Sequence, residues 1–425
     1  MTPKRIVHLT TFLQGGAGRA IADLACAQHD AGHDVVVFTS ATDEPGYGNY
    51  PAYLGRLSAA GVPVVVQDSL FKRDAALNDQ VLERLSARCA PDAVDVVHAH
   101  AAVPAAIGLR FAARAEGNCS PVWRGPCQVR AGAPDPGSPT RLARWGGVAR
   151  PTCEPEAPRR PVVIQTQHGW GTSKSLAQAR HDLDVLNAVD RVIVTSNATG
   201  DFLAASGVPR DRLVTIPCGL SPDIPSIAQE AADIGRTLRR EGGFILGCVG
   251  SVNDNKNQRL VVRALAEHID RSVRAVFIGE GGHVLEAIAS ELGVSNRVHA
   301  LGYHDDAERW MELFDALIVP SRSEGQGLVV LEAFRAGVPV LASNIPALRE
   351  LVCDYETGWL FESDDARSLA DAIERAASAA EDVRGRIIET ASKLFLDRYT
   401  IDLMVARHEA LYDELLSAAT QRTPA

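Results

Sequence analysis

Lysine, aromatic residues and long hydrophobic runs are all scarce in this sequence of 425 residues. Aromatic residues make up 5% of the chain, and no run approaches the roughly 18 apolar residues that a membrane-spanning helix requires. The apolar run after the N-terminal basic residues, residues 6–9, is too short for the core of a signal peptide. These absences exclude a membrane-spanning helix and favour a soluble protein, which we expect to be cytoplasmic.

The cysteine spacing and the net charge argue against a zinc or disulfide-rich protein and against a nucleic-acid-binding protein. The eight cysteines form no CxxC pair and show no zinc-ligand spacing, which argues against a zinc site and a disulfide framework. The formal net charge is −10, divided as +2 over residues 1–220 and −12 over residues 221–425. An acidic chain without a basic stripe is not expected to bind nucleic acid. Only five of the 43 basic residues are lysines, so a lysine within a motif is informative.

The length and the hydrophobic pattern predict two α/β domains. Domains average about 150 residues, so one core is not expected for this chain. Short apolar runs alternate with amphipathic segments, which is typical of a parallel sheet covered by helices on both faces. A proline-rich break, SPDIP, follows residue 220, and the alternation restarts at residues 244–250. We therefore predict an N-terminal domain over residues 1–220, a C-terminal domain over 221–402 and a terminal helix over about 403–418.

One segment interrupts this alternation. Residues 117–160 contain eight prolines and six glycines in 44 positions, and their seven arginines outnumber three acidic residues. This composition is typical of a low-complexity surface insertion, although a long loop can also form a binding lid. Its basic charge makes it the candidate for any peripheral membrane contact.

The strongest local motif spans residues 321–343, SRSEGQGLVVLEAFRAGVPVLAS, directly after a predicted strand. A strand that leads through a glycine-rich loop into a helix places backbone N–H groups where a phosphate can bind. Glu324 precedes the predicted helix and Glu332 lies within it. Eight helical residues span about 12 Å, whereas paired glycosidase carboxylates lie roughly 5–9.5 Å apart. The two glutamates are therefore expected to contact two ends of one extended ligand.

This motif and several others resemble the GT-B glycosyltransferases of glycosyltransferase family 4, which are retaining enzymes with nucleotide-sugar donors. The block EGQGLVVLEA (324–333) with GVPV (337–340) matches the family signature, except that Gln326 replaces the usual Phe. Further similar segments are GGAGRAIADLA (15–25), HAH (98–100), TQHGW (166–170), VIVTSNA (192–198), IPCGL (216–220), VGSVNDNKNQ (249–258) and FIGEGG (277–282). The resemblance implies two Rossmann-like, doubly wound domains facing each other across a cleft, with the last helix packing back on the first domain.

The resemblance also implies roles for residues of the donor site in the C-terminal domain. Glu332 would accept hydrogen bonds from the ribose, and Glu324 would contact the donor sugar. Lys256 would neutralise the diphosphate, which Gly16 would approach from the N-terminal domain. Backbone N–H groups would help to hold sugar and diphosphate at Gly325, Gln326, Gly327, Leu328 and Val329. Ser251 stands where the family usually has Arg, so Asn253, Asn255 or another arginine must compensate, or donor affinity is weaker.

On the acceptor side, the resemblance implies that His168 and Ser196 line the site near the reacting carbon. His100, at a strand end, is a further candidate on that side, although a histidine at a strand end is more often structural. The resemblance implies metal-independent transfer without a cofactor, and the DxD sequence at residues 182–184 falls in a predicted helix where surface charge explains it. We therefore predict no metal.

Other functions remain open from the sequence. A second GT-B chemistry, such as nucleotide-sugar epimerisation, uses a similar cleft without an acceptor. A non-catalytic relative could bind a partner through the arginine-rich insertion, with Ser251 marking a decayed site. UDP-, GDP- and ADP-sugars all suit the motif. The acceptor, a small molecule, a carbohydrate or a natural product, and the oligomeric state are not determined by these residues.

Overall fold

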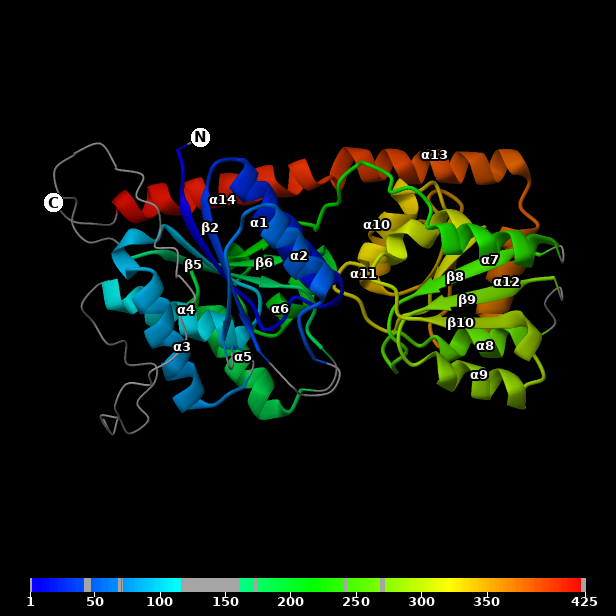
Figure 1. Cartoon of the computed structure of the whole chain (residues 1–425), viewed down its shortest axis with the longest axis horizontal. Coiled ribbons are helices and arrows are strands. Elements are labelled where there is room, and N and C mark those ends of the chain that lie inside the picture. The colour runs from blue at the N-terminus through cyan, green and yellow to red at the C-terminus, as the bar shows by residue number, and fades with distance from the viewer. Residues whose placement is uncertain are drawn as a thin grey trace.

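The computed structural model describes residues 2–41, 47–67, 70, 72–115, 160–171, 174–240, 243–267 and 272–421. The predicted insertion at 117–160 lies outside these residues, apart from Arg160. Two parallel sheets dominate the described part, with strand orders β3-β2-β1-β4-β5-β6-β7 and β10-β9-β8-β11-β12-β13. Helices flank both sheets (Figure 1). The prediction of two doubly wound α/β domains is confirmed.

The first sheet and its helices comprise β1 (Arg5–Leu9), α1 (Gly15–Asp30), β2 (Asp34–Ser40), α2 (Pro51–Ala59), β3 (Val64–Gln67), α3 (Ala75–Arg88), β4 (Val96–Ala99), α4 (Ala102–Ala115), β5 (Val162–Gln167), α5 (Leu176–Ala188), β6 (Arg191–Val194), α6 (Asn197–Ala205) and β7 (Leu213–Thr215). The second comprises α7 (Gln229–Arg240), β8 (Ile245–Val249), α8 (Arg259–Ala266), β9 (Arg274–Ile278), α9 (Gly282–Glu291), β10 (Val298–Gly302), β11 (Ala316–Val319), α10 (Leu328–Arg335), β12 (Val340–Ser343), α11 (Pro346–Arg349), β13 (Trp359–Phe361) and α12 (Ala366–Ala377). The chain ends with α13 (Glu381–Arg398) and α14 (Ile401–Gln421). Short 3₁₀ turns lie at Pro91–Ala93, Arg210–Arg212, Ser295–Arg297 and Ala307–Leu313.

The central strands are buried on both faces because helices cover both sides of each sheet. Val7 of β1, for example, pairs in register with Val36 of β2 and Val97 of β4, and all three are fully buried. Strand order reverses beside β1 in the first sheet and beside β8 in the second. In such open sheets, ligands bind outside the carboxyl ends of the strands at the point of reversal. The loops after β1, β8 and β11 are therefore the places to look for a site.

The last two helices connect the domains. Figure 1 shows α13 along the second domain and α14 continuing along the first. Helix α14 packs on α1, and its apolar face, which includes Met404 and Tyr412, joins the core under the first sheet. The chain crosses between domains where Leu220 bridges Thr400, and a Cβ atom at Gly219 would overlap the Thr400 carbonyl group. Glycine at this position therefore permits the two crossing segments to touch.

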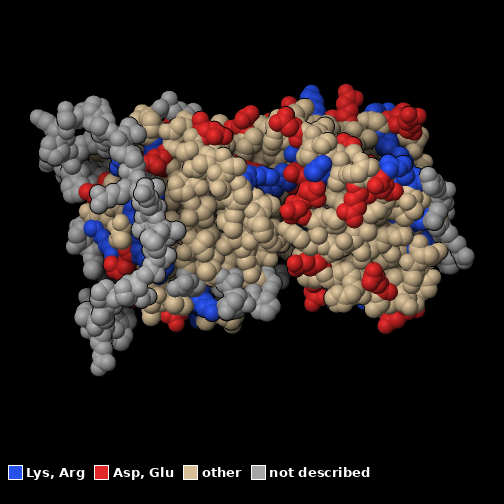
Figure 2. Space-filling model, viewed as in Figure 1, with Lys and Arg blue, Asp and Glu red and all other residues tan. Residues whose placement is uncertain are grey.

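Acidic side chains are distributed over the visible face of the second domain, as Figure 2 shows, in keeping with the charge difference between the two halves. Among the helices of the described residues, none is both long enough and apolar enough to cross a membrane.

Candidate functional site

A cavity of about 630 Å³ lies between the two domains at the carboxyl ends of their strands. Its walls come from the start of α1, from the loops after β5, β8, β9 and β11, and from α10. All the residues predicted for the donor site line it, together with His168: Gly16, Ser251, Lys256, Glu324, Gly325, Gln326, Gly327, Leu328, Val329 and Glu332. The cavity thus brings together residues that lie up to 318 positions apart in the chain, from Gln14 to Glu332.

Lys256 and Glu324 form an ion pair on the wall of this cavity. The Lys256 Nζ lies 2.6 Å from Oε1 of Glu324, which also accepts a hydrogen bond from Ser321 Oγ at 2.7 Å. Asn253 accepts a hydrogen bond from the Lys256 N–H, and Asn255 donates to the Ser323 carbonyl. These contacts fix the loop after β8 against the loop after β11, so the ammonium group is held beside the start of α10.

Arg19 of α1 reaches across the cavity to carboxylates of the second domain. Its two terminal nitrogens lie 2.7 Å from Oε1 of Glu332 and 2.5 Å from Oε2 of Glu308. Arg335 holds the same Glu308 oxygen at 2.7 Å. Burial raises the pKa of the Glu332 carboxyl, and the charge of Arg19 opposes that shift. An arginine that lies outside the predicted site residues therefore occupies the carboxylate expected to bind the ribose.

The glycine-rich loop before α10 serves the contact between domains as well as the cavity. A Cβ atom at Gly325 would overlap the carbonyl oxygen of His168, so glycine allows the two backbones to touch. Gly327 has a φ of +93° and directly precedes the helix. The backbone that approaches Gly325 closely is therefore that of the first domain, at His168.

Gln326 makes a two-point hydrogen bond to the segment that links the domains. Its Oε1 accepts from the Cys218 N–H at 2.7 Å, and its Nε2 donates to the Cys218 carbonyl at 3.1 Å. A phenylalanine, usual in the family signature, could form neither bond. The departure from the signature therefore has a local structural role, with both backbone groups of Cys218 satisfied.

The three residues predicted for the acceptor side lie at different depths. His168 lines the cavity, whereas His100 is buried behind it, with its Nδ1 3.2 Å from Nε2 of His168. Burial lowers the pKa of His168 to about 4, so its ring is neutral near pH 7. Ser196 is buried at the start of α6 and caps that helix by accepting a hydrogen bond from the Thr199 N–H. Neither Ser196 nor His100 is part of the cavity wall.

Several residues of the cavity wall were not predicted from the sequence. Arg19 and Glu308 are two charged examples, and Tyr50 and Tyr303 meet edge to face across the cavity with ring centroids 5.3 Å apart. Arg19 lies within the glycine motif of residues 15–25, which is the sequence feature that could have identified it as a site residue. The tyrosines and Glu308 occur in no recognised motif.

Groups that could hold a metal lie away from the cavity wall. In the described part of the chain, His8, His98 and His100 have ring nitrogens within 4.8 Å of one another. These rings hydrogen-bond to one another or to Gln28, Thr166, Tyr412 and His168. Asp182 of the DxD sequence pairs with Arg73 and Lys174 on the first domain. Protein groups therefore already satisfy both sets.

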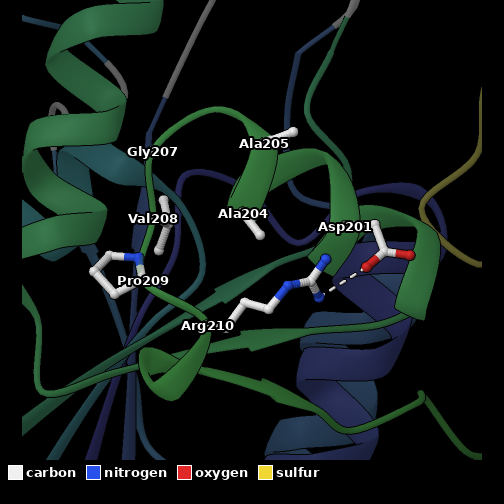
Figure 3. A pocket seen from close by; sticks show the side chains of 7 residues that line it. All are labelled: Asp201, Ala204, Ala205, Gly207, Val208, Pro209 and Arg210. Carbon is white, nitrogen blue, oxygen red and sulfur yellow. Dashed lines mark ion pairs between the residues drawn. The ribbon is translucent and has the colours of Figure 1, made fainter.

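A second hollow, of about 480 Å³, lies on the outer surface of the first domain (Figure 3). Small apolar residues and the exposed ion pair of Asp201 with Arg210, 2.9 Å apart, form its wall. It contains no nucleophile and no buried charge. The cavity between the domains is therefore the candidate functional site.

Comparisons with known proteins show the family of the chain. Residues 15–219 match the family described as "Glycosyl transferase 4-like domain", and residues 230–394 match "Glycosyl transferases group 1". The chain belongs to the GT-B glycosyltransferases of family 4. Both matched segments of this glycosyltransferase contribute residues to the cavity wall.

The relatives of this glycosyltransferase match either nearly the whole chain or a part of it. A D-inositol 3-phosphate glycosyltransferase of Acidothermus cellulolyticus is 28% identical over 470 aligned positions, covering 99% of this chain and 93% of its own. A putative glycosyltransferase of Bacillus subtilis, EpsD, is 35% identical over 140 residues, 32% of this chain and 37% of its own. The structure of Anabaena Alr3699/HepE in complex with UDP and glucose superposes with a TM-score of 0.75 at 18% identity, covering 97% and 100% of the two chains.

Proposed function

We propose that this glycosyltransferase is a retaining enzyme that transfers a sugar from a nucleotide-sugar to a hydroxyl-bearing small molecule or carbohydrate. One observation carries the proposal: Glu332, Glu324, Lys256 and the start of α10 all face one cavity between two Rossmann-like domains. The bound UDP and glucose of the similar Anabaena structure support a nucleotide-sugar as donor. The names of relatives, which include an inositol 3-phosphate glycosyltransferase and lipopolysaccharide mannosyltransferases, support hydroxyl acceptors.

In this proposal the donor spans the cavity along α10. The ribose hydroxyls donate to the Glu332 carboxylate, and the sugar hydroxyls donate to Glu324. The diphosphate accepts hydrogen bonds from backbone N–H groups at the start of α10, where the helix dipole favours negative charge. Lys256, which already lies on the cavity wall, adds a full positive charge.

Arg19 supplies the second cation that the family usually provides at the position of Ser251. Arg19 lines the same cavity as Ser251 and Lys256, and its present partner is the expected ribose ligand. Ribose hydroxyls that bind Glu332 would replace Arg19 there, and the freed guanidinium would pair with the diphosphate. In this exchange Arg19 gains the opposite charge of the diphosphate, and the Glu332 carboxylate stays hydrogen-bonded by the ribose hydroxyls, so neither buried charge is left without a polar partner.

Transfer then proceeds with retention at the anomeric carbon. The bond from this carbon to the diphosphate oxygen breaks as the acceptor oxygen attacks the same face. The acceptor proton passes to a leaving phosphate oxygen. Lys256, Arg19 and the N-terminus of α10 stabilise the negative charge that develops on the leaving group. His168, which follows β5, lines the cavity on the side of the N-terminal domain. Closure of the two domains excludes water and so favours transfer over hydrolysis.

A thermal-shift panel tests donor binding. UDP, GDP and ADP are added separately to the wild type, to Glu332→Gln and to Glu312→Gln, a control at an exposed glutamate outside the cavity. We expect one nucleotide to raise the melting temperature of the wild type and of the control, and not of Glu332→Gln. Unchanged melting temperatures with every nucleotide would overturn the proposal.

Turnover separates the remaining functions. Release of the nucleoside diphosphate that depends on an added acceptor supports transfer. Conversion of the nucleotide-sugar without release of the diphosphate identifies an epimerase instead. Nucleotide binding with no turnover against a panel of acceptors, including inositol 3-phosphate, identifies a non-catalytic relative.

A further inference from the structure

A chain of buried side chains leads from α14 through the first sheet to the cavity. Nε2 of Gln28 lies 3.4 Å from Oε1 of Glu409, and Oε1 of Gln28 lies 2.8 Å from Nε2 of His8. Nδ1 of His8 is 3.0 Å from Nε2 of His100, and Nδ1 of His100 is 3.2 Å from Nε2 of His168. His168 is the member that reaches the cavity wall. The chain therefore connects the interdomain helix to the candidate acceptor side.

The α14 end of this chain has a fixed hydrogen-bond direction. Glu409 is 2% exposed and accepts a hydrogen bond from Lys4 Nζ at 2.8 Å. Burial by itself would raise the pKa of Glu409, but His33 and Lys4 hold it below its usual value, so the group is ionised near neutral pH. An ionised carboxylate can only accept hydrogen bonds. The amide nitrogen of Gln28 must therefore face Glu409, and its oxygen must face His8.

This direction propagates through the histidines because each neutral ring carries a single N–H. Burial lowers the pKa of His8 and of His168 to about 4, and that of His100 well below its usual value, so all three rings are neutral near pH 7. His8 must donate from Nε2 to Gln28 and accept at Nδ1 from His100. His100 then accepts at its own Nδ1 from the Nε2–H of His168. The remaining lone pair lies on Nδ1 of His168.

We infer that Gln28, His8 and His100 are positioning residues that hold His168 in its Nε2–H tautomer, so that its Nδ1 accepts a hydrogen bond from a substrate hydroxyl in the cavity. The inference rests on the proposed function for the identity of that hydroxyl, which belongs to the acceptor or to the donor sugar. Within the described residues, no hydrogen-bond partner of Nδ1 is found, and the His168 ring lies against the cavity. The opposite tautomer would present a donor there and would repel the proton of a hydroxyl aimed at it.

Substitutions of buried residues distinguish this role from simple packing. Gln28→Leu removes the acceptor for the His8 Nε2–H, so that His8, His100 and His168 are no longer restricted to one tautomer. Gln67→Leu makes the same chemical change at a buried glutamine of β3 outside the chain and serves as the control. His8→Asn keeps an acceptor, because the asparagine oxygen occupies nearly the same place as Nδ1 of histidine, and it should preserve the direction at His100.

The tautomer is read directly from long-range ¹⁵N–¹H correlation spectra of the ¹⁵N-histidine-labelled full chain, with the His168 signals assigned by a His168→Asn variant. We expect a protonated Nε2 and a bare Nδ1 in the wild type, in Gln67→Leu and in His8→Asn, and a mixture of tautomers in Gln28→Leu. Because general acid–base and hydroxyl-orienting groups contribute roughly 100-fold or more, kcat should fall at least about tenfold in Gln28→Leu. The dissociation constant of the nucleoside diphosphate should not change, since the proposed contact of His168 is with a hydroxyl of the acceptor or of the donor sugar and not with the nucleoside diphosphate.

Protonated Nδ1 in the wild type, or an unchanged tautomer in Gln28→Leu, would overturn the inference. If Gln28→Leu does not fold, His8→Leu compared with His8→Asn provides the same contrast. The spectra need no substrate, so a wild type that shows the expected tautomer but no transfer contradicts the proposed function and leaves the tautomer assignment standing.

Discussion

At the residue scale, the proposed donor site implies that nucleotide binding would change the ion pair of Arg19 with Glu332. We predict that Arg19→Leu raises the dissociation constant of the nucleoside diphosphate at least about tenfold more than it raises that of the plain nucleoside. The reason is that a charge-assisted contact to the phosphates is lost. The ratio of the two dissociation constants, measured by calorimetry, isolates the diphosphate contribution from any change at the ribose. Arg56→Leu is the control, because Arg56 also lines the cavity and pairs with Asp23. Equal losses for nucleoside and diphosphate in Arg19→Leu would show that Arg19 acts only at the ribose carboxylate.

Gly325 gives a second prediction at the residue scale. Gly325→Ala places a methyl group against the His168 carbonyl oxygen, and overpacking of this kind destabilises proteins by about 1–3 kcal/mol. We expect either a lower free energy of unfolding or a larger radius of gyration as the domains separate, measured by urea denaturation and small-angle scattering. Gly385→Ala lies in α13 with open space around its new Cβ atom, and it should stabilise the helix by about 0.5–1 kcal/mol. Identical behaviour of the two variants would mean that the contact at Gly325 yields without cost.

At the scale of elements, Lys4 ties the first strand to the last helix. It precedes β1, is 4% exposed, and lies 2.8 Å from Glu409 and 2.9 Å from Asp413 of α14. Lys4→Met leaves the buried Glu409 charge short of its principal partner, which typically costs about 3–5 kcal/mol. Urea denaturation should show this loss, whereas Lys393→Met, on the exposed side of α13, should change stability by less than about 0.5 kcal/mol. A loss of similar size in both variants would assign the effect to lysine removal in general.

Elements whose signal is local were predictable from the sequence, and their ends were less so. Buried strands such as β1 and β4 consist of continuous apolar runs, which are the signal on which the predicted α/β alternation depends. Helix α3 begins at Ala75, where the Asp74 side chain caps it by accepting from the Leu77 N–H. The helix expected over about 403–418 extends over Ile401–Gln421. Hydrophobic spacing does not indicate a polar cap, so the exact ends of helices do not follow from the apolar pattern.

The residues predicted for the donor side occur in short motifs and line one cavity, whereas no motif indicates the contacts between distant segments. Arg19 and Glu332 are 313 positions apart, and Gln28 and Glu409 are 381 apart. No local pattern indicates which charge will meet which across such a separation. The two-point bond of Gln326 to Cys218 likewise depends on the path of the interdomain segment, so the sequence shows the substitution without its partner.

At the scale of the whole molecule, the buried histidines make stability depend on pH. Burial lowers the pKa of His8, His168 and His408 to about 4, against about 6.5 in an unfolded chain. Between pH 4 and pH 6.5 these histidines are protonated in the unfolded state but not in the folded state, so acid favours unfolding. The stabilisation is fully present above pH 6.5 and is lost as the pH falls towards 4, by about 1.4 kcal/mol per pH unit for each histidine.

The free energy of unfolding, measured in urea at pH 7.5 and at pH 5.0, should therefore decrease by several kcal/mol on acidification. His8→Asn removes one of these protonation sites and should reduce the decrease by about 2 kcal/mol, which is 1.4 kcal/mol per unit over the 1.5 units below pH 6.5. His283→Asn changes an exposed ring on α9 and should leave the decrease as in the wild type. Because the histidine chain, α14 and the first sheet form one core, this loss should occur as a single cooperative transition of the first domain. A free energy that is equal at the two pH values would contradict the neutral state of the buried rings, and with it the direction of the hydrogen bonds that end at His168.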